Sequence, residues 1–187
     1  METKNIEVEF RTLLTEGQYL SLMDFLLKNG EDLGEDDKDT YFFIFQDKLL
    51  KVVNNLSKKS GKIVLKLNKL GKGSDFEEIE IPIVQDQVDR TAKLFELLNL
   101  PAQIIHNGQK RRNFVYQGVE IAMKYSDDWG YHAELEIVIG EPKEKEAAVI
   151  RIEEISKKLG LKLMTDEEII EFTQRIEADY GKRKNQG

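Results

Sequence analysis

Two short stretches of this chain place glutamates one residue apart within an alternation of apolar residues. IEVEF, residues 6–10, contains Glu7 and Glu9, and AELEI, residues 133–137, contains Glu134 and Glu136. In a strand such a pair lies on one face, about 7 Å apart. Two carboxylates at that distance repel each other by roughly 2 kcal/mol at an effective dielectric constant near 20. Oxygen ligands of this kind suit the hard cations Mg²⁺ and Mn²⁺.

Basic residues occur with a similar spacing on other predicted strands: Arg11, Lys51, Lys62, Lys66, Lys110 and Arg112. If the sheet closes with its charged face inside, the glutamates would bind divalent ions and the basic residues would bind an anion. A polyphosphate chelated by a metal ion satisfies both requirements. The alternative is that all of these charges face water on the outside of an ordinary antiparallel sheet.

The pattern of apolar residues predicts the elements that must position these charges. Alternation predicts about eight short strands, at residues 5–11, 40–45, 48–54, 62–68, 76–81, 112–117, 119–125 and 131–138. Four helices are expected: one opened by a capping box at Thr15 and ended by Gly30, one at 84–98, one at 144–159, and one from Thr165 to about Tyr180. Residues 30–39, GEDLGEDDKD, are predicted to form an acidic loop.

These elements favour a single α+β domain at residues 1–180, followed by a disordered tail at 181–187. Many alternating strands with few exposed edges predict a mostly antiparallel eight-stranded β-barrel with helices packed outside. Trp129 follows Asp127 and Asp128 in a predicted rim loop, where it would either pack or contact the organic part of a substrate.

Composition narrows the classes of partner. The 187 residues carry a net charge of −7, which disfavours generic binding to nucleic acid or to an anionic membrane. Cysteine is absent, which excludes disulfides, thiolate metal sites and a cysteine nucleophile. The sequence shows neither a membrane-length apolar run nor a signal-peptide core, so a cytoplasmic protein is expected. A homodimer is left open.

Six short motifs follow one another along the chain: EVEFR at 7–11, DTYF at 39–42, VLKL at 64–67, FEEIEI at 76–81, KRR at 110–112 and GYHAELEI at 130–137. Taken in order, they resemble the motifs of the CYTH family, the triphosphate tunnel metalloenzymes. EVEFR resembles the opening Glu-x-Glu-x-Lys signature of that family. The family includes class IV adenylate cyclases, thiamine triphosphatase and inorganic triphosphatases.

The resemblance implies a charged tunnel in which a metal ion and a triphosphate-containing small molecule bind together. It implies Mg²⁺ or Mn²⁺ as cofactor, with the metal ligands Glu7, Glu9, Glu134 and Glu136. The implied substrate-binding residues are Arg11, Lys51, Lys66, Lys110 and Arg112. The implied catalytic residues are Glu7, Glu9, Arg11 and Glu136. The implied activity is hydrolysis of inorganic triphosphate or of an organic or nucleoside triphosphate.

The chain departs from the family pattern at several positions. Arg11 stands in place of a lysine, Val53 in place of an arginine, Lys124 in place of an aspartate and His132 in place of a phenylalanine. The reduced set of basic residues favours hydrolysis over the cyclisation of ATP by a class IV adenylate cyclase, which is the close alternative. The same departures motivate a second alternative, a non-catalytic module that binds polyphosphate or nucleotides.

Overall fold

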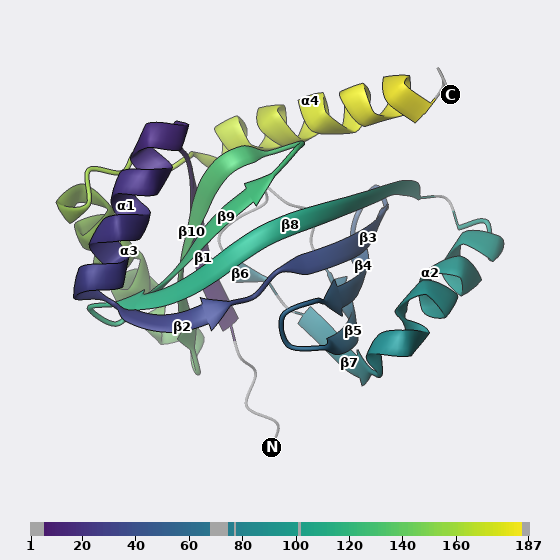
Figure 1. Ribbon diagram of the computed structural model, residues 1–187, viewed down its shortest axis with the longest axis horizontal. Helices are drawn as coiled ribbons and strands as arrows, with labels where there is room; N and C mark the ends of the chain where they lie inside the picture. Colours follow the sequence, from purple (N-terminus) through teal and green to yellow (C-terminus); the bar gives the residue numbers. More distant parts are fainter. Residues whose placement is uncertain (1–5, 68–74, 77, 101, 185–187) are drawn as a thin grey trace.

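The computed structural model describes residues 6–67, 75–76, 78–100 and 102–184. Within these residues one antiparallel sheet curls into a half-barrel (Figure 1). Its strands are β1 (Ile6–Leu13), β2 (Glu31–Glu35), β3 (Lys38–Ile44), β4 (Leu49–Asn55), β5 (Ser60–Lys66), β6 (Asp75–Phe76), β7 (Glu78–Ile83), β8 (Gln103–Tyr116), β9 (Val119–Ser126) and β10 (Gly130–Ile139).

The order of the strands explains the curvature. The path runs β6-β1-β10-β9-β8-β3-β4-β5-β7, and β2 pairs with β8 beside it. The strands β6 and β7 follow one another in sequence on either side of residue 77, and they pair with β1 and β5, at the two ends of the path. Counted as one strand they give an eight-stranded antiparallel path whose ends approach each other. The predicted α+β class and antiparallel barrel architecture are therefore confirmed, in the form of a half-barrel.

Four α-helices surround the sheet: α1 (Glu16–Asn29), α2 (Val88–Leu97), α3 (Lys145–Lys158) and α4 (Asp166–Lys184). In Figure 1, α1 and α3 lie together at one end of the sheet, α2 lies at the other end, and α4 runs across the top. The predicted capping box opens α1, because the Gln18 backbone N–H donates to Thr15 Oγ1 at 3.2 Å. None of the described helices combines the length and hydrophobicity that crossing a bilayer requires.

The apolar core lies between the sheet and these helices, on the outer face of the sheet. Leu26 of α1 and Ile152 of α3 are fully buried against Phe114 and Leu135, and α2 buries Val88 in a second cluster around Phe43 and Val52. Burying each such side chain contributes roughly 1.5–3 kcal/mol. Because alternate residues of a strand point to opposite faces, a core on the outside leaves the concave face to the intervening residues.

One prediction about a loop is wrong. Residues 31–35, predicted as part of an acidic loop, form β2 and pair with β8, with a register shift between Asp32 and Gly34. Gly34 has a φ of +86°, which glycine adopts at a bulge without steric cost. The helix α4 extends to Lys184, and the disorder of the tail stays a prediction. Residues 185–187 of that tail, like Asn68 of a predicted strand, lie outside the described residues.

Candidate metal and triphosphate site

The concave face of the half-barrel encloses a cavity of about 300 Å³, which we call the charged cavity. Seven acidic residues line it: Glu7, Glu9, Glu78, Glu80, Glu120, Glu134 and Glu136. Seven basic residues line it as well: Arg11, Lys38, Lys51, Lys62, Lys66, Arg111 and Lys124. The acidic and basic residues of the cavity balance one another in number, so a bound triphosphate would add several negative charges that no basic residue of the set offsets. Divalent cations bound at the glutamates would offset them.

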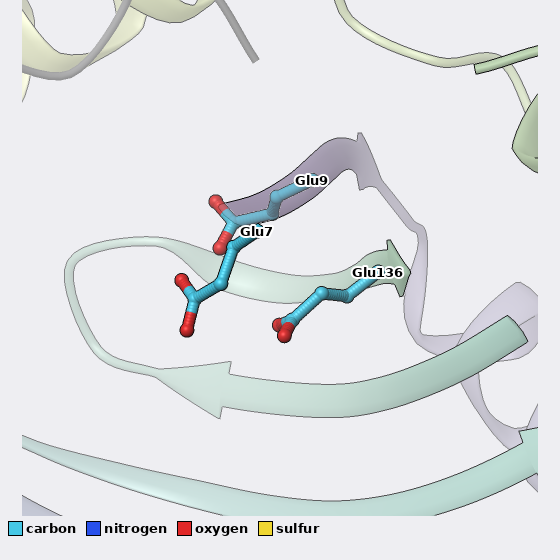
Figure 2. Close-up of side chains that lie close together, drawn as sticks. All are labelled: Glu7, Glu9 and Glu136. Atoms are coloured by element: carbon cyan, nitrogen blue, oxygen red, sulfur yellow. The ribbon is translucent and has the colours of Figure 1, made fainter. Parts of the chain in front are cut away.

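Three of the predicted residues form one acidic cluster. Glu7 and Glu9 extend from β1 and Glu136 from β10, where Glu136 is the register partner of Glu9. Each offers a carboxylate oxygen within 4.8 Å of the others, and Figure 2 shows the three side chains directed into the same space. Burial, followed by the charges of Glu7 and Glu9, raises the pKa of Glu136 to about 7. Burial and Glu78 raise the pKa of Glu7 as well.

This cluster fits a hard divalent cation. It is the sole group of three or more candidate ligands within the described part of the chain. Oxygens around an octahedral Mg²⁺ lie about 3–4 Å apart, as ligand distances near 2.1 Å require. Small side-chain rotations would bring the three glutamates to that spacing. Glu7 and Glu9 have basic partners in Lys66 and Arg11, whereas burial and the neighbouring carboxylates raise the pKa of Glu136.

Glu134 lies in the charged cavity but outside the acidic cluster, and its role as a metal ligand stays a prediction. Its Oε1 accepts a hydrogen bond from Arg11 Nε at 2.9 Å, and Lys124 Nζ donates to its Oε2. Burial would raise the pKa of Glu134, but Lys124 and Arg11 outweigh burial and hold it well below the ordinary value. Burial lowers the pKa of Lys124 to about 7 and that of the neighbouring His132 to about 4.

Basic residues from neighbouring strands face the acidic cluster. Lys66 Nζ of β5 lies 3.8 Å from a carboxylate oxygen of Glu7 and also contacts Glu78. Lys51 of β4 lines the same cavity, and burial, followed by the charge of Lys66, lowers its pKa to about 8. The structure thus places Lys51 and Lys66 inside the half-barrel, and their role in binding the substrate stays a prediction.

Lys110 and Arg112 lie outside the charged cavity, and their role in binding the substrate stays a prediction. Arg112 Nη2 pairs with Asp32 at 2.5 Å, and Lys110 Nζ pairs with Asp37 at 2.7 Å. Arg111 lines the cavity instead, opposite Lys124 of β9. The sequence contains a signal that residue 111, and not residues 110 and 112, faces the cavity.

That signal is the apolar residue Phe114, which packs in the core on the outer face of β8. Residues 110 and 112 share its face because they differ from it by even numbers, whereas residue 111 points the other way. The predicted strand began only at residue 112, which hid the alternation. In the structure β8 extends from Gln103 to Tyr116.

Asp36 is a buried residue that sequence reasoning missed, since it falls in the predicted acidic loop. Lys38 Nζ lies 3.0 Å from its Oδ2, Arg111 Nε lies 3.4 Å from the same oxygen, and Asn55 Nδ2 donates to its Oδ1 at 2.6 Å. Burial opposes ionisation, but Lys38 and Asn55 outweigh it and hold the pKa of Asp36 below its usual range. Asp36 thus holds two basic residues of the cavity wall in place.

Comparison with known proteins shows likeness at the level of structure. No family model matches the chain, and no curated protein matches it. A conserved hypothetical protein from Pyrococcus furiosus superposes with a TM-score of 0.68 at 24% identity, over 87% of this chain and 99% of that one. A "putative adenylate cyclase" from Vibrio parahaemolyticus gives a TM-score of 0.63 at 16% identity, over 87% and 91% of the two chains.

A third structure comes from the plant genus Hippeastrum. It is described as a "putative adenylyl cyclase" with a dominant triphosphatase activity, and it gives a TM-score of 0.59 at 18% identity, over 85% of this chain and 89% of that one. At these identities the likeness shows the fold that they share. That fold fits the resemblance of the sequence motifs to the CYTH family.

Proposed function

We propose that this chain is a CYTH-type hydrolase that cleaves triphosphate compounds in the charged cavity and depends on a divalent metal ion. One observation carries the proposal: three carboxylates whose oxygens lie within 4.8 Å of one another share one cavity with buried lysines and an arginine. If the charged residues lay on a solvent-exposed outer face of the sheet, their side chains would be exposed. Glu9, Arg11 and Lys66 are instead each less than one-tenth exposed. Buried charges are retained where a ligand or partner satisfies them.

The arrangement assigns each group a role. Glu7, Glu9 and Glu136 would hold Mg²⁺ or Mn²⁺, which supplies a Lewis acid for the phosphoryl oxygens and a more acidic bound water. Lys51, Lys66 and Arg111 would bind the phosphate oxygens. Because these groups come from strands of one rigid sheet, they are already in place before the substrate binds, which stabilises charge developing at the reacting phosphate.

Arg11 positions the acids and does not stand free in the cavity. It contacts Glu9 on its own strand and donates to Glu134 on β10. Burial would lower the pKa of Arg11, but Glu9 and Glu134 outweigh burial and raise it, so the guanidinium stays charged. It would therefore hold Glu9 toward the metal, and it would reach a phosphate oxygen only by giving up one carboxylate.

The proposal is tested by phosphate release from tripolyphosphate, with Mg²⁺, with Mn²⁺ and with a chelator. We expect release only with metal, and a loss of at least about a hundredfold in kcat/KM for Glu9→Gln. Glu153→Gln, an exposed carboxyl of α3, is the matched control and should behave as the wild type. Metal-independent release, or full activity in Glu9→Gln, would contradict the proposal.

A non-catalytic module that binds polyphosphate is the second candidate. Glu134, one of the predicted metal ligands, forms ion pairs with Lys124 and Arg11, which leaves three glutamates for the metal ion. It predicts a metal-dependent thermal shift with tripolyphosphate and no turnover. Adenylate cyclase activity, the other alternative, would appear in the same assay as cyclic AMP and pyrophosphate formed from ATP. The cytoplasmic location stays a prediction.

A further inference from the structure

Lys124 places a basic side chain where the resemblance to the CYTH family implies an aspartate. It belongs to β9, lines the charged cavity and is only 5% exposed. An aspartate with one bound divalent cation has a net charge of +1. The ammonium of Lys124 has the same charge and needs no metal ion. Lys124 can therefore supply the charge that a metal-bound aspartate would supply at this position.

The contacts of Lys124 direct its charge onto Glu134. Lys124 Nζ donates a hydrogen bond to Glu134 Oε2, and Arg11 Nε donates to Glu134 Oε1 at 2.9 Å. Both oxygens of this carboxylate therefore have a positively charged partner from the chain itself. All three residues are less than one-tenth exposed. Because separating a buried ion pair leaves an uncompensated charge in the interior, a metal ion would not readily displace Lys124 from Glu134.

A third basic side chain adds to the positive charge on this side of the cavity. Arg111 of β8 is the register partner of Lys124 and lines the same cavity. A divalent cation beside Glu134 would be repelled by all three basic side chains. Within the residues that the structure describes, the acidic cluster is the sole group of three candidate ligands, and Glu134 is not part of it. The geometry therefore leaves one place for a divalent ion.

We propose that Lys124 takes the place of a second divalent ion in the charged cavity, so that the chain binds one metal ion, at the acidic cluster. The proposal rests on the proposed function, because it assumes the metal site formed by Glu7, Glu9 and Glu136. It deepens that function by assigning to Lys124 part of the positive charge that balances the triphosphate. One ion suits the acidic cluster, since Mg²⁺ is usually bound by one or two carboxylates together with substrate phosphates.

The number of bound ions can be counted with Mn²⁺ by electron paramagnetic resonance, because the free ion gives a strong signal that weakens on binding. The titration uses the full chain and Mn²⁺ alone. Burial lowers the pKa of Lys124 to about 7, so the titration is made at pH 6, where its amine is mostly protonated. We expect the wild type to remove one Mn²⁺ per chain from solution, with the spectrum of an isolated ion and no coupling between two bound ions.

Three variants identify the ion and the residue that limits the count. Lys124→Asp restores the acid that the resemblance implies, and it should raise the count from one to two. Glu136→Gln removes a ligand of the acidic cluster, and it should weaken binding of the single ion at least about tenfold. Lys157→Asp makes the same change as Lys124→Asp at an exposed position of α3, and this matched control should bind one ion. Circular dichroism checks that each variant is folded.

Two tightly bound ions in the wild type would overturn the proposal, and this result does not depend on whether any variant folds. A count of one in folded Lys124→Asp would also overturn it, because Lys124 would then not be what limits the count. Both results leave the proposed function intact. Failure of the wild type to bind Mn²⁺, or unchanged binding in Glu136→Gln, would instead reject the metal site of the proposed function, and this inference with it.

Discussion

The acidic cluster should destabilise the protein when no metal is bound, and Glu136→Gln should relieve that destabilisation. The ordinary pKa of this carboxyl is 4.5, and in the folded protein it is about 7, first because of burial and then because of Glu7 and Glu9. The folded state therefore holds its proton more tightly than the unfolded state. Ionisation of Glu136 consequently costs folding free energy.

The size and sign of the effect follow from the two pKa values. Below about pH 4.5 the carboxyl is protonated in both states and the cost is absent. As the pH rises from 4.5 through 7 the unfolded state ionises first, and the protein loses stability. Above pH 7 the loss approaches about 3 kcal/mol. Because Glu136 is partly exposed, solvent screening reduces the expected value to about 1–3 kcal/mol.

The assay is urea unfolding of the wild type and Glu136→Gln in a chelator, from pH 4.5 to pH 8.5. We expect the variant to be the more stable by about 1–3 kcal/mol at pH 8.5, with the difference vanishing near pH 4.5. Added Mn²⁺ should stabilise the wild type and have little effect on the variant. Glu153→Gln serves as the exposed control. A variant that is less stable at high pH, or a difference independent of pH, would refute the reasoning.

Three further predictions follow from individual contacts. Arg111→Gln should weaken tripolyphosphate binding at least about tenfold by calorimetry, because Arg111 lines the charged cavity. Arg112→Gln, on the outer face, should change the affinity less than twofold. A larger loss in Arg112→Gln than in Arg111→Gln would contradict the assignment of these two side chains to opposite faces of β8. Lys124→Met should lower the free energy of unfolding by about 2 kcal/mol, since Glu134 loses one of its partners. The double variant Lys124→Met, Glu134→Gln should recover part of the lost free energy of unfolding. An unchanged free energy of unfolding in Lys124→Met alone would show that the Lys124–Glu134 ion pair does not stabilise the fold. Thr15→Ala should cost about 1 kcal/mol in urea unfolding by removing the helix cap, and an unchanged midpoint would refute the cap's role.

Much of the barrel could be predicted from the sequence because its two faces alternate clearly. In β1, Val8 is fully buried in the outer core while Glu7 and Glu9 face the cavity, which is the alternation that IEVEF predicts. The capping box at Thr15 predicted the start of α1 for an equally local reason. Patterns that depend on neighbouring residues alone were therefore informative.

Local patterns do not reveal features that distant contacts decide. Asp36 looks like a solvent-exposed acid in its own segment, and it is buried because Lys38, Asn55 and Arg111 surround it. Glu134 resembles a metal ligand in the local pattern, but Lys124 on the adjacent strand occupies it. A mainly apolar cavity lined by residues of β3, β8 and α4 forms only when α4 packs over the sheet, so no local pattern reveals it.

The most direct test of the central claim is a crystal structure of the protein with Mn²⁺ and tripolyphosphate, with the metal located by its anomalous scattering. We expect the Mn²⁺ peak among the carboxylates of Glu7, Glu9 and Glu136, and phosphate density between that peak and the side chains of Lys51 and Arg111. Metal bound elsewhere, or phosphate on the outer face beside Lys110 and Arg112, would contradict the account.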